Sequence, residues 1–170
     1  MDKMEKIRKI KIKEVMQTKV GWLNESDPIE KAVNVLCSSE VSTLPVKNKK
    51  GELVGELVER DLLKSIINPH QMKPQELMFE PLIAMSFFPK TVHDAMRPTR
   101  LTLKPDDTVE YAACRMYRKQ TPLAAVREEG KLVGIITEDD LVRLMSEPVG
   151  KPECTLVKLE KKTLIKELKH

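Results

Sequence analysis

Two acidic residues stand at matching places in the chain, each six residues after a glycine. Asp61 follows Gly55, and Asp140 follows Gly134. Thr137 precedes Asp140 by three residues, which is the spacing of a capping box at a helix N-terminus. The same groups also suit ligand binding, because a carboxylate accepts from two neighbouring hydroxyls and a hydroxyl beside free N–H groups binds phosphate. Capping and ligand binding are both open for this pair, and they are compatible.

The first acid has no such hydroxyl beside it, because Val58 stands at the place of Thr137. Asp61 is therefore interpreted as an acid in the first turn of a helix, where the helix dipole favours negative charge. Three arginines, Arg60, Arg97 and Arg100, are charged groups that suit phosphate at the edge of a cleft. The simpler interpretation of each is a solvated surface side chain.

The chain offers little for catalysis or metal binding. It has no P-loop, no dinucleotide-binding glycine run, and no Ser-His-Asp or Cys-His order typical of nucleophilic catalysis. Its three cysteines are widely spaced and its histidines are few, which argues against a disulfide framework and a zinc site. Cys37 and Cys114 are predicted to be small core residues. We predict no catalytic residue, no required cofactor and no metal.

The composition indicates a soluble globular protein. Hydrophobic residues make up 41% of the 170 residues and charged residues 33%. No apolar run approaches the roughly 18 residues that cross a bilayer, and the N-terminus lacks the apolar segment of a secretory signal. We therefore predict a cytoplasmic protein without membrane association. A net charge of +4, spread along the chain, gives little support for nucleic-acid binding.

An internal repeat organises the chain. A shift of 80 residues aligns Asp27–Ala32 with Asp107–Ala112 and, after one residue is lost in a turn, Gly51–Gly55 aligns with Gly130–Gly134. Each copy predicts the order β-α-β-β-α. The expected strands are 20–23, 44–46 and 53–58 in the first copy and 100–103, 124–126 and 132–137 in the second. Because one copy of about 60 residues is marginal alone, the two are expected to share a core.

The first helix of each copy has an amphipathic pattern. The predicted apolar faces are Ile29, Ala32, Val33 and Leu36 in the first copy and Val109, Ala112, Ala113 and Met116 in the second. Asp27 and Asp107 are predicted to cap these helices. The second helices are expected to begin near Glu59 and Glu138.

The predicted boundaries follow from the repeat. The first domain covers 10–68 and the second 91–147. Residues 69–90 form a linker that is apolar enough to pack, with a short helix expected at Pro74–Phe79, and 148–170 form a basic tail.

With these features in place, the chain resembles the CBS-domain family in its tandem form, the Bateman module. The motifs nearest to the family pattern are Val41–Val46 and Gly134–Asp140, and the resemblance covers residues 10–145. It implies an α+β fold of two CBS domains, related by pseudo-two-fold symmetry and packed sheet to sheet. It also implies a homodimer.

The resemblance implies a ligand as well: AMP, ADP, ATP or S-adenosylmethionine, bound between the domains. In that scheme Asp140 holds the ribose hydroxyls and Thr137 meets phosphate. The implied ligand-binding residues are Val20, Gly21, Val41, Ser42, Gly134, Ile136, Thr137 and Asp140. A second site would use Asp61, Arg100, Thr121 and Pro122. Because Val58 stands where a hydroxyl belongs and Glu56 adds negative charge, three outcomes stay open for it: a ligand with an uncharged tail, weak binding, or an empty site.

The function expected from the resemblance is a non-enzymatic regulatory module that senses an adenosyl small molecule and signals to a separate, unidentified protein. Two alternatives stay open. Val58, and Ala125 where the first copy has Pro45, suggest a scaffold or dimerisation module without ligand. The lysine-rich ends suggest a nucleic-acid-associated module, which is the least favoured.

Overall fold

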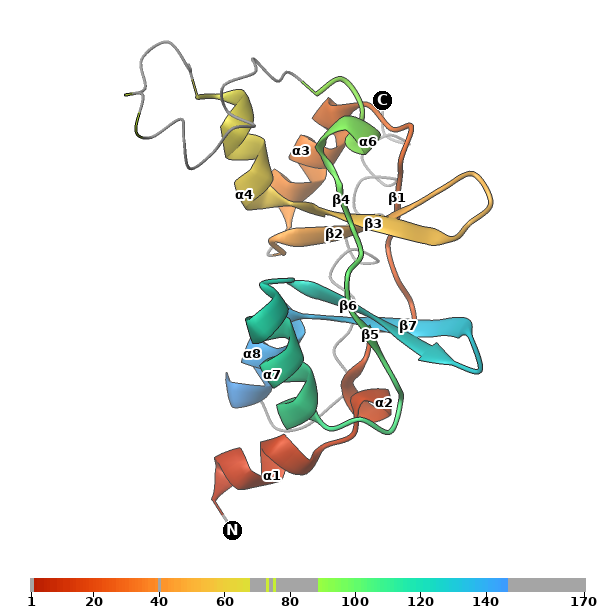
Figure 1. The fold of residues 1–170 in the computed structure, drawn as a ribbon, viewed down its shortest axis with the longest axis vertical. Helices are drawn as coiled ribbons and strands as arrows, with labels where there is room; N and C mark the ends of the chain where they lie inside the picture. The colour runs from red at the N-terminus through yellow and green to blue at the C-terminus, as the bar shows by residue number, and fades with distance from the viewer. Residues whose placement is uncertain (1, 40, 68–72, 74, 76–88, 147–170) are drawn as a thin grey trace, which may run out of the picture.

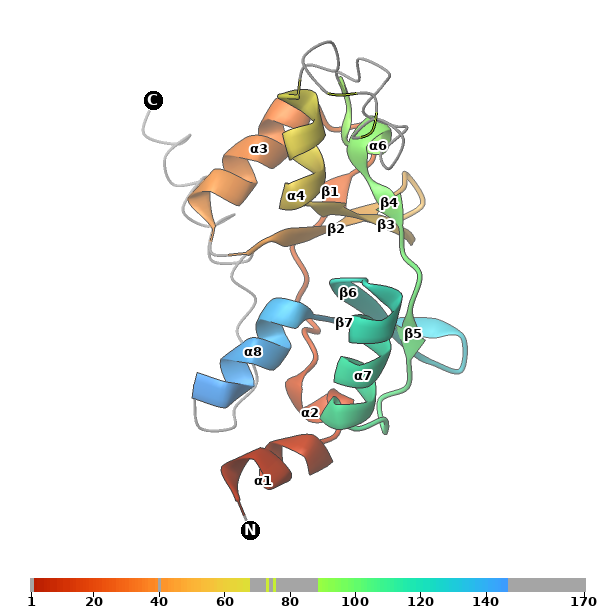
Figure 2. The ribbon, with the colours of Figure 1, turned by 60° about the vertical axis from the view of Figure 1, so that its left-hand side comes forward.

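The structure is a computed structural model, and it describes residues 2–39, 41–67, 73, 75 and 89–146. It contains two lobes, each a β-sheet with helices on its outer side (Figure 1). The first lobe has a four-stranded sheet in the order β1-β2-β3-β4, and the second a three-stranded sheet in the order β5-β6-β7. The two sheets face each other across the middle of the molecule (Figures 1 and 2). The predicted α+β fold with sheet-to-sheet packing is confirmed.

Both lobes follow the predicted β-α-β-β-α order. The first contains β1 (Leu23–Asn24), α3 (Ile29–Ser38), β2 (Thr43–Lys47), β3 (Leu53–Val58), α4 (Glu59–Leu62) and a 3₁₀ turn, η1 (Leu63–Ser65). The second contains β5 (Thr102–Leu103), α7 (Val109–Lys119), β6 (Leu123–Glu128), β7 (Lys131–Thr137) and α8 (Glu138–Ser146). The pairing repeats too, since the first strand is parallel to the second and the second antiparallel to the third. The leading strands are shorter than predicted.

The amphipathic helices bury a narrower stripe than predicted. Ala32 and Leu36 of α3 and Met116 of α7 lie in the core, but Val33 is 38% exposed and Ala113 is exposed as well. The prediction that Cys37 and Cys114 are core residues was wrong, because both are exposed. Each helix touches its sheet with one edge, so residues at the margins of the apolar pattern face outward.

The predicted capping by Asp27 and Asp107 was also wrong. The Asp27 carboxylate accepts from the backbone N–H of Asn24 at 2.9 Å, and Asp107 accepts from that of Lys104 at 2.7 Å. Both acids therefore stabilise the turn that precedes the helix. Thr108 is the residue that caps α7. The acid and the helix start lie close in sequence, which is why the spacing alone was misleading.

The segments that lead into the two repeats are exchanged between the lobes. Helix α2 (Ile12–Val15) buries its apolar side chains in the second lobe, where α1 (Lys3–Lys9) also packs. Helix α6 (Val92–Ala95) packs in the first lobe, and β4 (Arg97–Pro98) continues that lobe's sheet. The corresponding residue after α2, Gln17, forms a bridge with Ile135 of β7. Each lobe is thus completed by residues from the start of the other repeat (Figure 1).

Two glycines make this exchange sterically feasible. A Cβ atom on Gly55 would lie 2.5 Å from the carbonyl oxygen of Arg97, and one on Gly134 would lie 2.8 Å from that of Gln17. Real Cβ atoms do not approach oxygen so closely. The glycine that begins each motif therefore lets the exchanged segment cross the sheet backbone to backbone.

An apolar cluster joins the two sheets. Its buried members are Leu53, Leu123, Ala125 and Ile135, with Val20, Trp22 and Leu132 packed against them. The shared core expected from the repeat is present at this interface. The short helix expected at Pro74–Phe79 and the tail at 148–170 lie outside the described residues, apart from Gln75.

Candidate functional site

Asp61 and Asp140 occupy equivalent places in the two lobes, in the first turns of α4 and α8. Each carboxylate is held by a side chain from the exchanged segment. Arg97 contacts Asp61, and Gln17 contacts Asp140. Gln17 and Arg97 themselves correspond in the repeat. The two lobes therefore have the same backbone arrangement but different chemistry. The carboxylate of Asp61 pairs with a charged guanidinium, whereas that of Asp140 pairs with a neutral amide.

The Asp61 carboxylate has both oxygens engaged by Arg97. Arg97 Nη2 donates to Oδ1 at 2.8 Å, and Nε donates to Oδ2, while Lys64 Nζ lies 3.6 Å from Oδ1. Burial opposes ionisation of Asp61, but the hydrogen bonds and charge of Arg97, with Lys64, outweigh it and lower the pKa of this carboxyl below its ordinary value. The pair is a forked ion pair of the kind that fixes geometry as well as charge.

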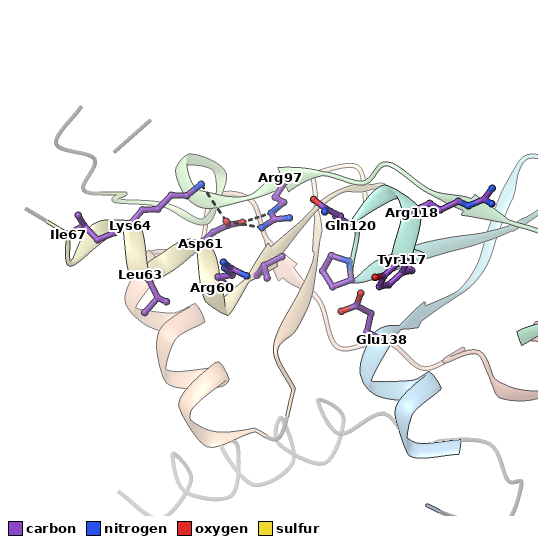
Figure 3. A pocket seen from close by; sticks show the side chains of 12 residues that line it. Arg60, Asp61, Leu63, Lys64, Ile67, Arg97, Tyr117, Arg118, Gln120 and Glu138 are labelled. Carbon is purple, nitrogen blue, oxygen red and sulfur yellow. Dashed lines mark hydrogen bonds and ion pairs between the residues drawn. The ribbon is translucent and has the colours of Figure 1, made fainter. Parts of the chain in front are cut away.

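A pocket of about 1060 Å³ opens beside this pair, between the two lobes (Figure 3). Its walls come from both lobes: α4 and its continuation on one side, and the end of α7 with the start of β6 and α8 on the other. Four cationic and two acidic side chains line it, together with apolar and neutral ones. The lining residues are Val58, Arg60, Asp61, Leu63, Lys64, Ile67, Arg97, Tyr117, Arg118, Gln120, Pro122 and Glu138.

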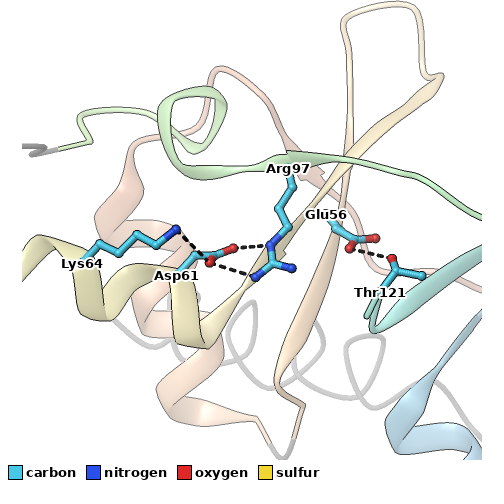
Figure 4. A network of polar contacts seen from close by, with 5 residues as sticks. All are labelled: Glu56, Asp61, Lys64, Arg97 and Thr121. Atoms are coloured by element: carbon cyan, nitrogen blue, oxygen red, sulfur yellow. Dashed lines mark hydrogen bonds and ion pairs between the residues drawn. The ribbon is translucent and has the colours of Figure 1, made fainter. Parts of the chain in front are cut away.

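Next to this pocket, Glu56 of β3 is buried at the contact between the lobes, with 1% of its surface exposed. The Thr121 hydroxyl lies 3.1 Å from Glu56 Oε1 and 3.2 Å from the carbonyl oxygen of Leu123 (Figure 4). Within the part of the chain that the structure describes, Glu56 Oε2 has no hydrogen-bond partner. Burial raises the pKa of Glu56 from 4.5 to about 7, against the effects of Thr121, Arg97 and Arg100. Thr121 is the donor in both contacts, so its single hydroxyl hydrogen is shared between the Glu56 carboxyl and the carbonyl oxygen of Leu123.

Both oxygens of the Asp140 carboxylate accept hydrogen bonds from side chains or backbone of the protein itself. Gln17 Nε2 donates to its two oxygens at 2.9 and 2.8 Å, and the backbone N–H and hydroxyl of Thr137 both donate to Oδ2 at 2.9 Å. The backbone N–H of Asp140 in turn donates to Thr137 Oγ1 at 3.2 Å. Burial raises the pKa of Asp140, although the bonds from Gln17 and Thr137 oppose the shift. The capping box predicted for Thr137 and Asp140 is present.

A second contact joins the lobes beside Asp140. The backbone N–H and the hydroxyl of Ser42 both donate to Asp139 Oδ2, at 3.2 and 3.1 Å. At the equivalent place by the Asp61 pocket stand Pro122 and Arg60, which do not form such a bond. The polar groups of the Asp140 site thus satisfy one another, while those of the Asp61 site face an open pocket.

The structure brings together part of the predicted site at Asp140. Thr137, Gly134 and Ile136 lie on β7, and Ser42 reaches their lobe through Asp139. Val20 packs in the apolar cluster between the sheets. Gly134 faces the backbone of Gln17. This close contact explains why a glycine stands here, and no ligand is needed to explain it. Gly21 is buried, and Val41 packs against the first lobe's core.

The second predicted site is only partly assembled around the pocket. Asp61 and Pro122 line it, whereas Thr121 is buried beneath it against Glu56. Arg100 is exposed and is not among the lining residues.

The partners of both acids, Gln17 and Arg97, were not predicted from the sequence. Gln17 was not considered, and Arg97 was interpreted as a surface arginine. One signal was present in the sequence: Gln17 follows Met16 as Arg97 follows Met96, at the repeat interval. Lys64, Tyr117 and Arg118 line the pocket without any pattern that marks them.

Among the described residues, no group of three or more His, Cys, Asp or Glu side chains is placed to hold a metal ion. The described helices are also too short or too polar for any of them to cross a bilayer.

The family model of the CBS domain matches this chain twice, at residues 12–68 and 92–147. The chain therefore belongs to the CBS-domain family, as a tandem pair. An uncharacterised protein of Methanocaldococcus jannaschii is 28% identical over 152 residues, covering 79% of this chain and 90% of that protein. Homoserine O-acetyltransferase of Methanococcoides burtonii is 30% identical over 135 residues, but this chain spans only 24% of that enzyme.

Solved structures share the fold. CBSX2 in complex with AMP is 24% identical, with a TM-score of 0.61 and coverage of 80% of this chain and 96% of that one. The CBS domain pair of protein MJ0100, in complex with 5′-methylthioadenosine and S-adenosyl-L-methionine, is 20% identical, with a TM-score of 0.57 and coverage of 81% and 96%. Both support the tandem arrangement of the two lobes.

Proposed function

We propose that this chain is a regulatory module that binds an adenosyl ligand between its lobes, the ligand being AMP, ADP, ATP or S-adenosylmethionine. The pocket at Asp61 is the observation that carries the proposal. It lies between the lobes, draws walls from both, and its volume of about 1060 Å³ has room for a ligand of this class. The complexes of CBSX2 with AMP and of MJ0100 with adenosyl compounds support the choice of ligand.

The pocket offers a partner for each part of such a ligand. Asp61 is a carboxylate that accepts from both hydroxyls of a ribose. Val58, Ile67 and Pro122 supply apolar surface for an adenine ring, and the cationic side chains meet a phosphate or carboxylate. The arrangement binds and orients a ligand, and no chemical step is assigned to it.

The Asp140 site is proposed as the weaker of two ligand positions. A ribose there must displace Gln17, which donates to both carboxylate oxygens, and must separate Ser42 from Asp139. The polar groups of this site already have partners within the protein. The free energy of binding is therefore only the difference between the contacts that the ligand makes and those that it replaces.

A ligand that contacts both lobes changes the free energy of their packing. Such a ligand shifts the protein toward the arrangement that it binds more tightly. We propose that a separate protein in the cytoplasm recognises this change. We also propose that the chain is a homodimer, supported by apolar side chains exposed on its helical turns: Ile66 is 81%, Tyr117 85% and Val142 63% exposed. Light scattering on the purified protein measures that state directly.

Isothermal titration with AMP, ADP, ATP and S-adenosylmethionine tests the proposal. Asp61→Asn is expected to weaken binding about tenfold or more, because the amide accepts from only one ribose hydroxyl. Asp140→Asn, the matched change in the other lobe, is expected to leave the stronger binding event unchanged. Loss of that event in Asp140→Asn alone would place the stronger site in the second lobe instead.

One observation favours a second candidate function, a ligand-independent scaffold. The acids of the Asp140 site are bonded within the protein, as expected of a site that serves structure. Absence of heat with all four ligands, in protein that circular dichroism shows to be folded, would favour the scaffold. Retention of partner binding by Asp61→Asn would point the same way.

A further inference from the structure

The Asp61 pocket contains a conflict between its carboxylate and any ribose. A ribose diol needs both oxygens of Asp61, and Arg97 occupies both. A ribose that bridges the two oxygens therefore competes with the guanidinium for that edge of the carboxylate. Arg97 lines the same pocket, so it can turn from Asp61 toward a ligand group inside that pocket (Figure 3).

The groups around Arg97 determine which ligands can replace Asp61 as its partner. Besides Asp61, the pocket lining has one more acid, Glu138, which belongs to the opposite lobe. Val58 has no hydroxyl to bind a phosphate. Arg60, Lys64 and Arg118 add positive charge. A neutral nucleoside that takes Asp61 would leave the half-buried guanidinium without its forked partner. S-adenosylmethionine carries one carboxylate that can pair with the guanidinium, but its sulfonium and ammonium groups add two cations to a pocket that already has four cationic side chains. A phosphate supplies the paired oxygens that an arginine fork binds.

We infer that the Asp61 pocket selects adenosyl ligands that carry a phosphate, and that Arg97 is the selecting residue, exchanging Asp61 for the phosphate as Asp61 takes the ribose. This inference rests on the proposed function, since it names the ligand class of the same pocket. The Asp140 site lacks this selection, because the residue equivalent to Arg97 is the uncharged Gln17.

The other lobe suggests the variant that tests the inference. Arg97→Gln gives Asp61 the partner that Asp140 has. Arg127→Gln removes the same charge from β6, away from the pocket lining, and serves as the control. Arg97→Lys keeps a cation without the fork, and it carries the test if Arg97→Gln does not fold. Thermal unfolding establishes folding for each variant before titration.

Titrations with AMP, adenosine and S-adenosylmethionine are compared across these proteins. The native chain is expected to bind AMP about tenfold or more tightly than the other two ligands, with an affinity that falls as salt is added. In Arg97→Gln the preference is expected to shrink to about threefold or less, mainly through weaker AMP binding. Arg97→Lys is expected to keep part of the preference, and Arg127→Gln all of it.

Two results would overturn the inference while leaving the proposed function in place. One is equal binding of AMP and adenosine by the native chain, and the other is a tenfold preference for AMP that survives in Arg97→Gln. A folded native chain that binds none of the three ligands would overturn the proposed function and this inference together.

Discussion

Gln17 and Asp140 lie 123 residues apart in the chain, and one amide nitrogen of Gln17 donates to both oxygens of the Asp140 carboxylate, at 2.9 and 2.8 Å. Both side chains are buried. The bond fastens the start of the first repeat to the second helix of the second repeat. Its removal leaves the buried carboxylate with the hydrogen bonds from Thr137 and the charge of Arg143.

Gln17→Ala is therefore expected to lower the free energy of unfolding by about 1–3 kcal/mol, the cost of leaving a buried polar group short of a partner. Denaturant unfolding followed by circular dichroism measures it. Thr18→Ala, at the next and exposed position, is the control and is expected to change stability by less than about 0.5 kcal/mol. Equal effects of the two changes would show that the Gln17 contact adds nothing to stability.

Glu56 gives the fold a dependence on pH. Its pKa of about 7 in the folded chain lies above the ordinary value of 4.5, so the fold favours the protonated form. The stabilisation from this proton is complete below about pH 4.5 and is lost as the pH rises through 7, by up to about 3 kcal/mol. Glu56→Gln cannot titrate, so it should unfold near the native midpoint at pH 5 and above it at pH 8.

The measurement is a series of chemical denaturation curves from pH 5 to pH 8 on both proteins. Glu30→Gln, an exposed change of the same kind, is expected to follow the native chain throughout. A constant difference between Glu56→Gln and the native chain at all these pH values would mean that Glu56 does not titrate in this range.

The close backbone contacts at Gly55 and Gly134 predict that an alanine at either position destabilises the fold, and they predict which change has the larger effect. Gly55→Ala places a Cβ 2.5 Å from the Arg97 carbonyl oxygen, and Gly134→Ala places one 2.8 Å from that of Gln17. Each should destabilise the fold by about 1–3 kcal/mol through overpacking, with Gly55→Ala the larger. Thermal unfolding of both variants checks the order, and an unchanged midpoint in either would contradict the close approach.

Thr137 tests the capping role separately from ligand binding. Thr137→Val removes the acceptor for the Asp140 N–H, at nearly constant volume, and should cost about 1 kcal/mol of stability without any ligand present. Thr102→Val, at an exposed position of β5, is the control for the same chemical change. If both variants unfold alike, the hydroxyl does not stabilise the start of α8.

Much of the architecture could be predicted because it repeats. The hairpins follow from apolar strands on either side of a glycine turn, and the equivalence of Asp61 and Asp140 follows from their identical spacing to Gly55 and Gly134. The leading segments could not be assigned to a lobe in this way. An apolar residue such as Ile12 shows that a face is buried, but not which lobe buries it.

The chemistry of the two sites was harder to predict than their positions. Asp61 and Arg97 are 36 residues apart, on either side of the linker, and an arginine near a cleft edge has no local pattern that distinguishes it from a solvated one. The openness of the Asp61 pocket also depends on contacts between lobes, such as the bond from Ser42 to Asp139 in the other site. Such contacts arise only once both lobes are folded.

The exchange of leading segments has a consequence for the ancestry of the chain. Residues 12–17 pack on the sheet of the other repeat. A single ancestral repeat with such a leading segment would have had no second sheet for the segment to pack on. Two separate copies could have supplied each other, as in a domain-swapped dimer. Joining two such copies in one chain keeps the same exchange within a single molecule. Cutting the chain between the repeats would restore two mutually dependent halves, so the smallest autonomous folding unit is the pair.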